Sequence, residues 1–148
     1  MNDIITGSRP VVLVVDDDAE CGATIEFALQ AIPGIDVVLA ASAERAREVL
    51  QEGPRPSHAD ICAVITDLQL PNMTGLEMIG WIRTQTRFRD LPIIVISAAT
   101  DPSAPARAVQ LGATAFFAKP FSPSAVRQRL RELLELVPHV SHQETKHA

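Results

Sequence analysis

Polar and charged side chains stand at the ends of the short apolar runs in this sequence, where buried strands would end. They are Asp16, Asp17 and Asp18 after the first run, Asp67 after the third, Ser97 at the end of the fourth, and Lys119 after the fifth. Carboxylates that lie close together repel one another unless a cation neutralises them. A few carboxylate oxygens suit Mg²⁺, and a lysine ammonium suits a phosphate oxygen. Brought together, these residues would suit a metal-assisted phosphate site.

Such a set could also carry out group transfer. A carboxylate can be the nucleophile that accepts a phosphoryl group, while metal, ammonium and hydroxyl stabilise the phosphoryl oxygens. Taken singly, each residue has a simpler explanation: Asp18 can cap a helix, Asp67 can form a turn, and Lys119 can lie on the surface. The combination is what favours phosphoryl chemistry.

Five apolar runs are available to position these residues. They are Val11 to Val15, Ile35 to Leu39, Ile61 to Ile65, Ile93 to Ile96, and the weaker Ala113 to Ala118. Continuous apolar runs without alternation are typical of strands covered on both faces, as in a parallel sheet.

Helical patterns lie between and after the runs. The first helix carries an apolar stripe from Cys21 to Ile32 and ends at Pro33-Gly34. The other four helices begin at Ser42, at Thr74 with Glu77 in capping-box spacing, at Asp101-Pro102, and at Ser122-Pro123. This alternation predicts an α/β fold with a doubly wound, five-stranded parallel sheet and five helices. Ligands of such folds bind beyond the carboxyl ends of the strands, so the polar residues above should share one rim.

Length and composition are consistent with one globular domain. The chain has 148 residues, 47% hydrophobic and 21% charged, with a net charge of −5 that speaks against nonspecific nucleic-acid binding. Cys21 and Cys62 form no CxxC pair, and neither a signal peptide nor a membrane-spanning run is present. We therefore expect a cytoplasmic protein with a short N-terminal extension over residues 1–10 and a flexible tail over 138–148.

Four motifs resemble the receiver domain of two-component response regulators, and of stand-alone chemotaxis regulators in particular. They are Val-Val-Asp-Asp-Asp at 14–18, Ile-Thr-Asp-Leu-Gln-Leu-Pro-Asn-Met-Thr-Gly at 65–75, Ile-Ser-Ala at 96–98 and Phe-Ala-Lys-Pro-Phe at 117–121. The resemblance covers Val11 to about Val137 and implies a flavodoxin-like fold over 11–137.

The resemblance also implies a role for each matched residue. Asp67 would be the phosphoacceptor and a Mg²⁺ ligand. Asp17 would bind Mg²⁺ directly, Asp16 mainly through water, and Gln69 through its backbone carbonyl. Lys119 would pair with Asp67 and then with a phosphoryl oxygen.

The same resemblance implies a switch. Ser97 would bond another phosphoryl oxygen and move inward on phosphorylation, and Phe116 stands where the family has an aromatic side chain that follows this movement. Gln69 and Ala99 would flank the path of the attacking water. The Lys119-Pro120 bond would be cis, as X-Pro bonds can be.

The implied partners are a sensor histidine kinase or a histidine phosphotransfer protein as donor, and an unknown protein as target. The target surface would lie on the fourth helix, fifth strand and last helix, including Ala106, Arg107, Gln110, Phe116 and Arg127. A homodimer could form on phosphorylation.

The eleven residues after Val137 are too few for an output domain, so the output would be a protein contact. Apart from phosphorylating and dephosphorylating itself, such a chain would not be an enzyme, and neither nucleic acid nor membrane is an expected partner.

Two other functions fit parts of the pattern. Asp16-x-Asp18 is similar to the nucleophile motif of haloacid-dehalogenase-like phosphatases, but Glu20 stands where that family has Thr or Val, and Asp67 would be unexplained. The second of these functions is that of a receiver-like interaction module that is never phosphorylated. A nucleotide-binding oxidoreductase is excluded because no glycine-rich loop follows the first run.

Overall fold

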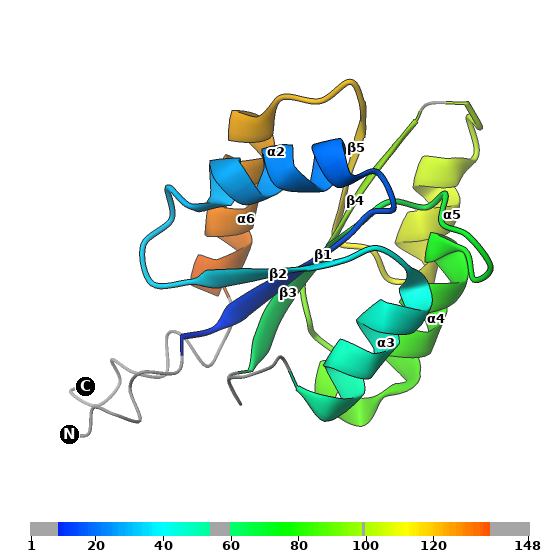
Figure 1. The fold of residues 1–148 in the computed structure, drawn as a ribbon. Helices are drawn as coiled ribbons and strands as arrows, with labels where there is room; N and C mark the ends of the chain where they lie inside the picture. Colours follow the sequence, from blue (N-terminus) through cyan, green and yellow to red (C-terminus); the bar gives the residue numbers. More distant parts are fainter. Residues whose placement is uncertain (1–8, 54–59, 99, 137–148) are drawn as a thin grey trace.

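The computed structural model describes residues 9–53, 60–98 and 100–136. Five parallel strands form a single sheet in the order β2-β1-β3-β4-β5 (Figure 1). The strands are β1 (Val11–Val15), β2 (Asp36–Ala40), β3 (Ile61–Thr66), β4 (Ile93–Ala98) and β5 (Ala115–Lys119). The predicted α/β fold with a doubly wound, five-stranded parallel sheet is therefore confirmed.

Helices cover both faces of the sheet. They are α2 (Ala19–Leu29), α3 (Ala43–Glu52), α4 (Gly75–Thr84), α5 (Ala104–Leu111) and α6 (Pro123–Leu136), with a short 3₁₀ turn η1 (Thr86–Phe88). Figure 1 shows α2 and α6 on one face and α3, α4 and α5 on the other. In the described part of the chain, no helix combines the length and apolar character needed to cross a membrane.

The buried side chains form two cores, one on each face of the sheet. Successive residues of a strand point to opposite faces, so Leu13 and Val15 of β1 join the core under α3, α4 and α5. Val12 and Val14 join the core under α2 and α6. All five residues of β1 are buried, as expected for a central strand. The edge strands β2 and β5 are partly exposed and so depart from the expected coverage on both faces.

Side-chain caps begin several helices where the sequence predicts them. The side chain of Thr74 accepts from the backbone of Glu77, whose carboxylate accepts from the backbone of Thr74, completing the predicted capping box of α4. Ser42 caps α3 with a single hydrogen bond, which its side chain accepts from the backbone N–H of Arg45. The left-handed Gly112 (φ 118°) ends α5.

Two predicted helix bounds are wrong. The first helix ends at Leu29 rather than near Pro33, because Ala31 and Ile32 donate to carbonyls three residues back, in tighter turns. The fourth begins at Ala104 rather than at Pro102. Asp101 instead accepts from the backbone and hydroxyl of Ser103 and forms a turn before the helix.

Several predictions fall on residues outside the described ranges. These are residues 1–8 of the expected N-terminal extension, the tail at 138–148, and Ala99.

Candidate functional site

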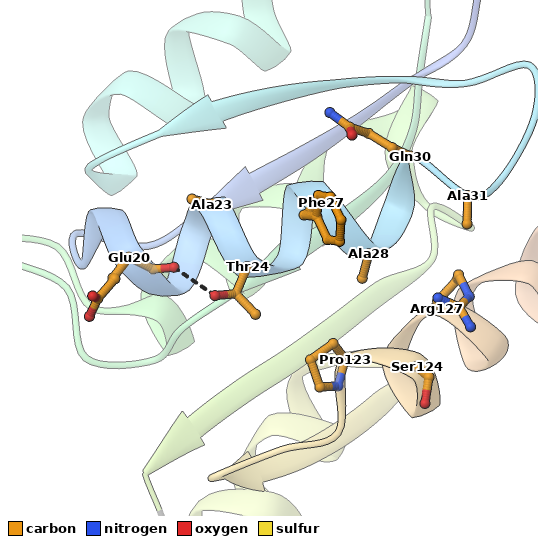
Figure 2. A pocket seen from close by; sticks show the side chains of 10 residues that line it. All are labelled: Glu20, Ala23, Thr24, Phe27, Ala28, Gln30, Ala31, Pro123, Ser124 and Arg127. Carbon is orange, nitrogen blue, oxygen red and sulfur yellow. Dashed lines mark hydrogen bonds between the residues drawn. The ribbon is translucent and has the colours of Figure 1, made fainter.

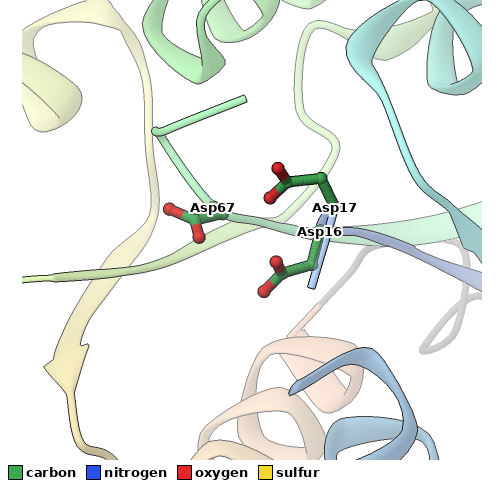
Figure 3. Close-up of side chains that lie close together, drawn as sticks. All are labelled: Asp16, Asp17 and Asp67. Atoms are coloured by element: carbon green, nitrogen blue, oxygen red, sulfur yellow. The ribbon is translucent and has the colours of Figure 1, made fainter. Parts of the chain in front are cut away.

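The candidate site lies at the carboxyl ends of β1 and β3, where the strand order reverses. Val15 pairs with Thr66 in the register of these neighbouring strands, so the residues that follow, Asp16 and Asp67, emerge side by side. The backbone N–H of Asp67 donates to the carbonyl of Val15 at 3.0 Å and fixes this end of the pairing. Figure 3 shows the carboxylates of Asp16, Asp17 and Asp67 gathered at this edge.

The three carboxylates form a compact oxygen cluster. One oxygen from each of Asp16, Asp17 and Asp67 lies within 4.8 Å of the others. Asp16 and Asp67 are 8% and 6% exposed, whereas Asp17 faces solvent. Two buried acids and an exposed one give an all-oxygen donor set that remains open to water. That combination fits Mg²⁺, which keeps several of its waters.

Lys119, at the end of β5, neutralises part of this charge. Its ammonium lies 2.8 Å from Oδ2 of Asp67 and 3.4 Å from Oδ2 of Asp16. Burial lowers the pKa of Lys119, but the hydrogen bond and charge of Asp67, with the charge of Asp16, outweigh burial and raise the pKa above its ordinary value. The side chain is therefore an ammonium at neutral pH.

Both oxygens of the Asp67 carboxylate are held by donors. The backbone N–H of Gln69 and the hydroxyl of Ser97 donate to Oδ1 at 3.0 and 3.1 Å, and Lys119 donates to Oδ2. The amide of the Gln69 side chain donates to the hydroxyl of Thr100 at 3.4 Å and links the loops after β3 and β4. The carboxylate is thus fixed in orientation while charged.

The structure brings together most of the predicted site residues, and it separates two residues from the rest. Asp18 is used elsewhere: its carboxylate caps α2 through the backbone N–H groups of Glu20 and Cys21. That role removes the second acid of the Asp16-x-Asp18 phosphatase motif from the cluster. Phe116 pairs with Val95 in the register of β4 and β5, is partly buried, and packs against the core under α3, α4 and α5.

Two residues of the predicted target surface line different grooves. Arg127 lines a groove between α2 and the start of α6, whereas Arg107 lines a second groove between α4 and α5. This part of α6 faces α2, and the place of Arg127 on a target surface stays a prediction.

Two residues near the site had no predicted role there. Gly75 approaches the backbone of Asp67 so closely that a Cβ at this position would lie 2.3 Å from the Asp67 carbonyl oxygen. Cys21, in the first turn of α2, lies close enough to Asp16 for that carboxylate to help raise the pKa of its thiol. The sequence shows only that Cys21 follows Asp16 closely along the chain. Whether the two side chains meet depends on the direction in which α2 leaves the loop.

The two thiols predict a loss of stability at alkaline pH. Burial, followed by the hydrogen bond and charge of Asp16, raises the pKa of Cys21 from 9.0 to about 12, and burial raises that of Cys62 from 9.0 to about 11. At a pH between the ordinary and the raised pKa of each thiol, the folded chain keeps a proton on that thiol that the unfolded chain has lost. The free energy of unfolding should therefore fall as the pH rises above about 9.

Denaturant unfolding on both sides of that pH window measures this effect. The Cys21→Ser variant, which has no thiol to ionise at this position, should show a shallower decline than the natural chain. Equal declines in the two proteins would contradict the assignment.

Comparison with known proteins gives a consistent result. The model of the response regulator receiver domain family matches residues 12–131. The chain is 30% identical to the chemotaxis protein CheY1 of Helicobacter pylori over 123 residues, covering 83% of this chain and 95% of that protein. It is 32% identical over 130 residues to the probable transcriptional regulator ycf27 of Porphyridium aerugineum; the match covers 88% of this chain but only 50% of the longer protein.

A solved structure shares the fold closely. The crystal structure of a putative response regulator from Chloroflexus aurantiacus superimposes with a TM-score of 0.76 at 29% identity, covering 86% of this chain and 99% of that one. The chain therefore belongs to the response regulator receiver domain family, whose members are phosphoacceptor signalling domains rather than classical enzymes.

Proposed function

We propose that Asp67 accepts a phosphoryl group from a phosphohistidine of a sensor kinase or a phosphotransfer protein. In this transfer a P–O bond to the Asp67 carboxylate forms as the P–N bond to the donor histidine breaks. The observation that carries the proposal is the Asp67 carboxylate itself: it is nearly buried, held by three donors, and 2.8 Å from an ammonium. A fixed carboxylate beside a cation suits attack on phosphorus, because the incoming group brings further negative charge.

Each neighbour has a distinct part in this proposal. The backbone N–H of Gln69 and the hydroxyl of Ser97 orient the carboxylate before the reaction. Lys119 already donates to Oδ2, the other oxygen of the Asp67 carboxylate. After transfer it would pair with a negatively charged phosphoryl oxygen. Ser97 would bond another phosphoryl oxygen and so move inward.

Magnesium fits the acidic cluster. Receiver domains generally bind Mg²⁺ at an acidic pocket. Here Asp17 and Asp67 would bind it directly, Asp16 through water, and Gln69 through its carbonyl. When bound, the ion would offset the charge of the phosphoryl oxygens.

We propose that the domain over 11–137 signals by changing a protein contact surface. Receiver domains similar to CheY interact with histidine kinases and downstream targets. Phosphorylation adds nearly two negative charges at the end of β3. Ser97 lies on β4, and Phe116 on β5 pairs with the same strand. A shift of Ser97 would therefore be transmitted to the aromatic ring by the pairing of β4 with β5. The target surface would then include Phe116 with Ala106, Arg107 and Gln110 of α5.

Intact mass after incubation with acetyl phosphate and Mg²⁺ tests the acceptor. The natural chain should gain one phosphoryl group, and the Asp67→Asn variant should gain none. Asp101→Asn is the matched control, since Asp101 is an exposed acid in another loop and its loss should leave the gain unchanged.

Two results would contradict the proposal. One is a gain of equal size in Asp67→Asn. The other is no gain in the natural chain with either acetyl phosphate or a cognate kinase, which would favour a module that is never phosphorylated. Steady turnover of a phosphate ester would instead favour the phosphatase function.

A further inference from the structure

A groove lies between α2 and the first turns of α6, on the side of α2 that faces away from the sheet. Its volume is about 880 Å³. Small side chains make up much of its lining, among them Ala23, Thr24, Ala28 and Ala31 (Figure 2). The groove lies outside the carboxylate cluster, and none of the site residues described above lines it.

Phe27 stands at this groove and is turned out to solvent. At 78% exposure it is the most exposed large hydrophobic side chain of the described residues. An aromatic ring left in water beside a hollow lined by small residues is typical of an interaction surface. The same patch therefore carries both a projection and a depression into which a ring of this size could fit.

The charges at the groove have opposite signs at its two ends. Figure 2 places Glu20 at the N-terminal end of α2 and Arg127 near its C-terminal end. Among the ion pairs of residues 9–53, 60–98 and 100–136, none involves Glu20 or Arg127. Both charges are thus available to a partner.

A patch with these properties is complementary to itself. In a two-fold contact the same surface meets its own copy turned end for end, so each end of the groove faces the opposite end of the other. Antiparallel α2 helices would bring Glu20 of one protomer to Arg127 of the other, twice. The ring of Phe27 of each protomer would meet the small side chains of the other.

We propose that the groove between α2 and α6 binds a second copy of this chain and forms a two-fold dimer. Phe27 fills the facing groove, and Glu20 pairs with the partner's Arg127. The dimer does not rest on the proposed function, because its contacts come from α2 and α6 and not from Asp67. It should form without phosphorylation.

Sedimentation velocity of the full chain over a wide range of concentration tests the dimer. The natural chain should pass from monomer to dimer as concentration rises. Phe27→Ala should raise the dissociation constant about tenfold or more, as loss of a central aromatic anchor does. Val109→Ala is the matched control: Val109 is 57% exposed but lies on α5, and its loss should leave the dissociation constant unchanged.

Charge reversal tests the predicted pairing. Glu20→Arg alone and Arg127→Glu alone should each weaken the dimer, because each sets like charges opposite one another. An equal mixture of the two variants should dimerise again, since the mixed pair has opposite charges at both contacts. Circular dichroism of each variant confirms that it is folded.

Three outcomes would overturn the dimer. One is a natural chain that stays monomeric at every concentration. Another is a mixture of the charge variants that associates no better than either variant alone. The third is a Phe27→Ala variant with unchanged sedimentation but slower phosphoryl transfer from a histidine kinase, which would assign the groove to the phosphodonor.

Discussion

Replacing Gly75 with alanine should destabilise the protein by about 3 kcal/mol, although it adds a single methyl group. A Cβ at Gly75 would lie 2.3 Å from the carbonyl oxygen of Asp67 and 2.6 Å from Cα of Leu68. Both neighbours are backbone atoms, so they cannot turn aside as a flexible side chain would. Relief requires α4 to move away or the end of β3 to shift. Because that segment carries the Asp67 carboxylate, phosphoryl uptake from acetyl phosphate should also slow.

The control for this prediction lies on the same helix. A Cβ at Gly80 of α4 would meet only Cδ2 of Leu111, at 4.0 Å, an ordinary contact. Gly80→Ala should therefore be neutral or stabilise the protein by up to about 1 kcal/mol through helix propensity. Denaturant unfolding of the two variants measures the difference. Equal losses in both would show that the close approach at Gly75 is not the cause.

Replacing Lys119 with methionine should lower the free energy of unfolding by about 2 kcal/mol in the presence of a chelator. The change leaves the nearly buried Asp16 and Asp67 facing each other without their ammonium, and an uncompensated buried charge is strongly destabilising. The loss should be smaller than for a fully enclosed pair, because the Lys119 side chain is 25% exposed. Added Mg²⁺ should stabilise the variant more than the natural chain, since the variant carries more unbalanced negative charge.

Two further variants separate charge from packing. Lys119→Arg keeps the positive charge and should lose less stability than Lys119→Met. Combining Lys119→Met with Asp67→Asn should recover part of the loss, because the repulsion between the acids is then removed. Equal stability of Lys119→Met and the natural chain in chelator would show that the ion pairs contribute little.

The features that were predicted correctly from the sequence are those that depend on local signals or on rules of topology. The run at β1 is continuous and apolar, and the structure buries all of it. Thr74 and Glu77 lie three residues apart, and both of their capping hydrogen bonds form. The meeting of Asp16, Asp67, Ser97 and Lys119 required no distances, because parallel strands of one sheet end at the same edge.

The errors come from features that spacing along the chain does not determine. The apolar stripe of the first helix continues to Ile32 because a tighter turn after Leu29 keeps the same side facing the core. The groove beside Arg127 was not predicted, because a single helix pattern does not say which neighbouring helix lies beside each of its flanks. The close approach of Gly75 to Asp67 and the exposure of Phe27 are likewise properties of packed elements.

The spread of the site over four strands also bears on how the chain folds. Its contacts join residues far apart in sequence: Ser97 to Asp67 across 30 positions, Lys119 to Asp67 across 52, and Lys119 to Asp16 across 103. Long separations of this kind slow folding, because the chain must close large loops before the contacts stabilise it. During synthesis the acids emerge long before β5 brings the lysine. A chain folded only as far as β4 would already gather its acids at the edge of the sheet, and pairing of the last strand would supply the charge that balances them.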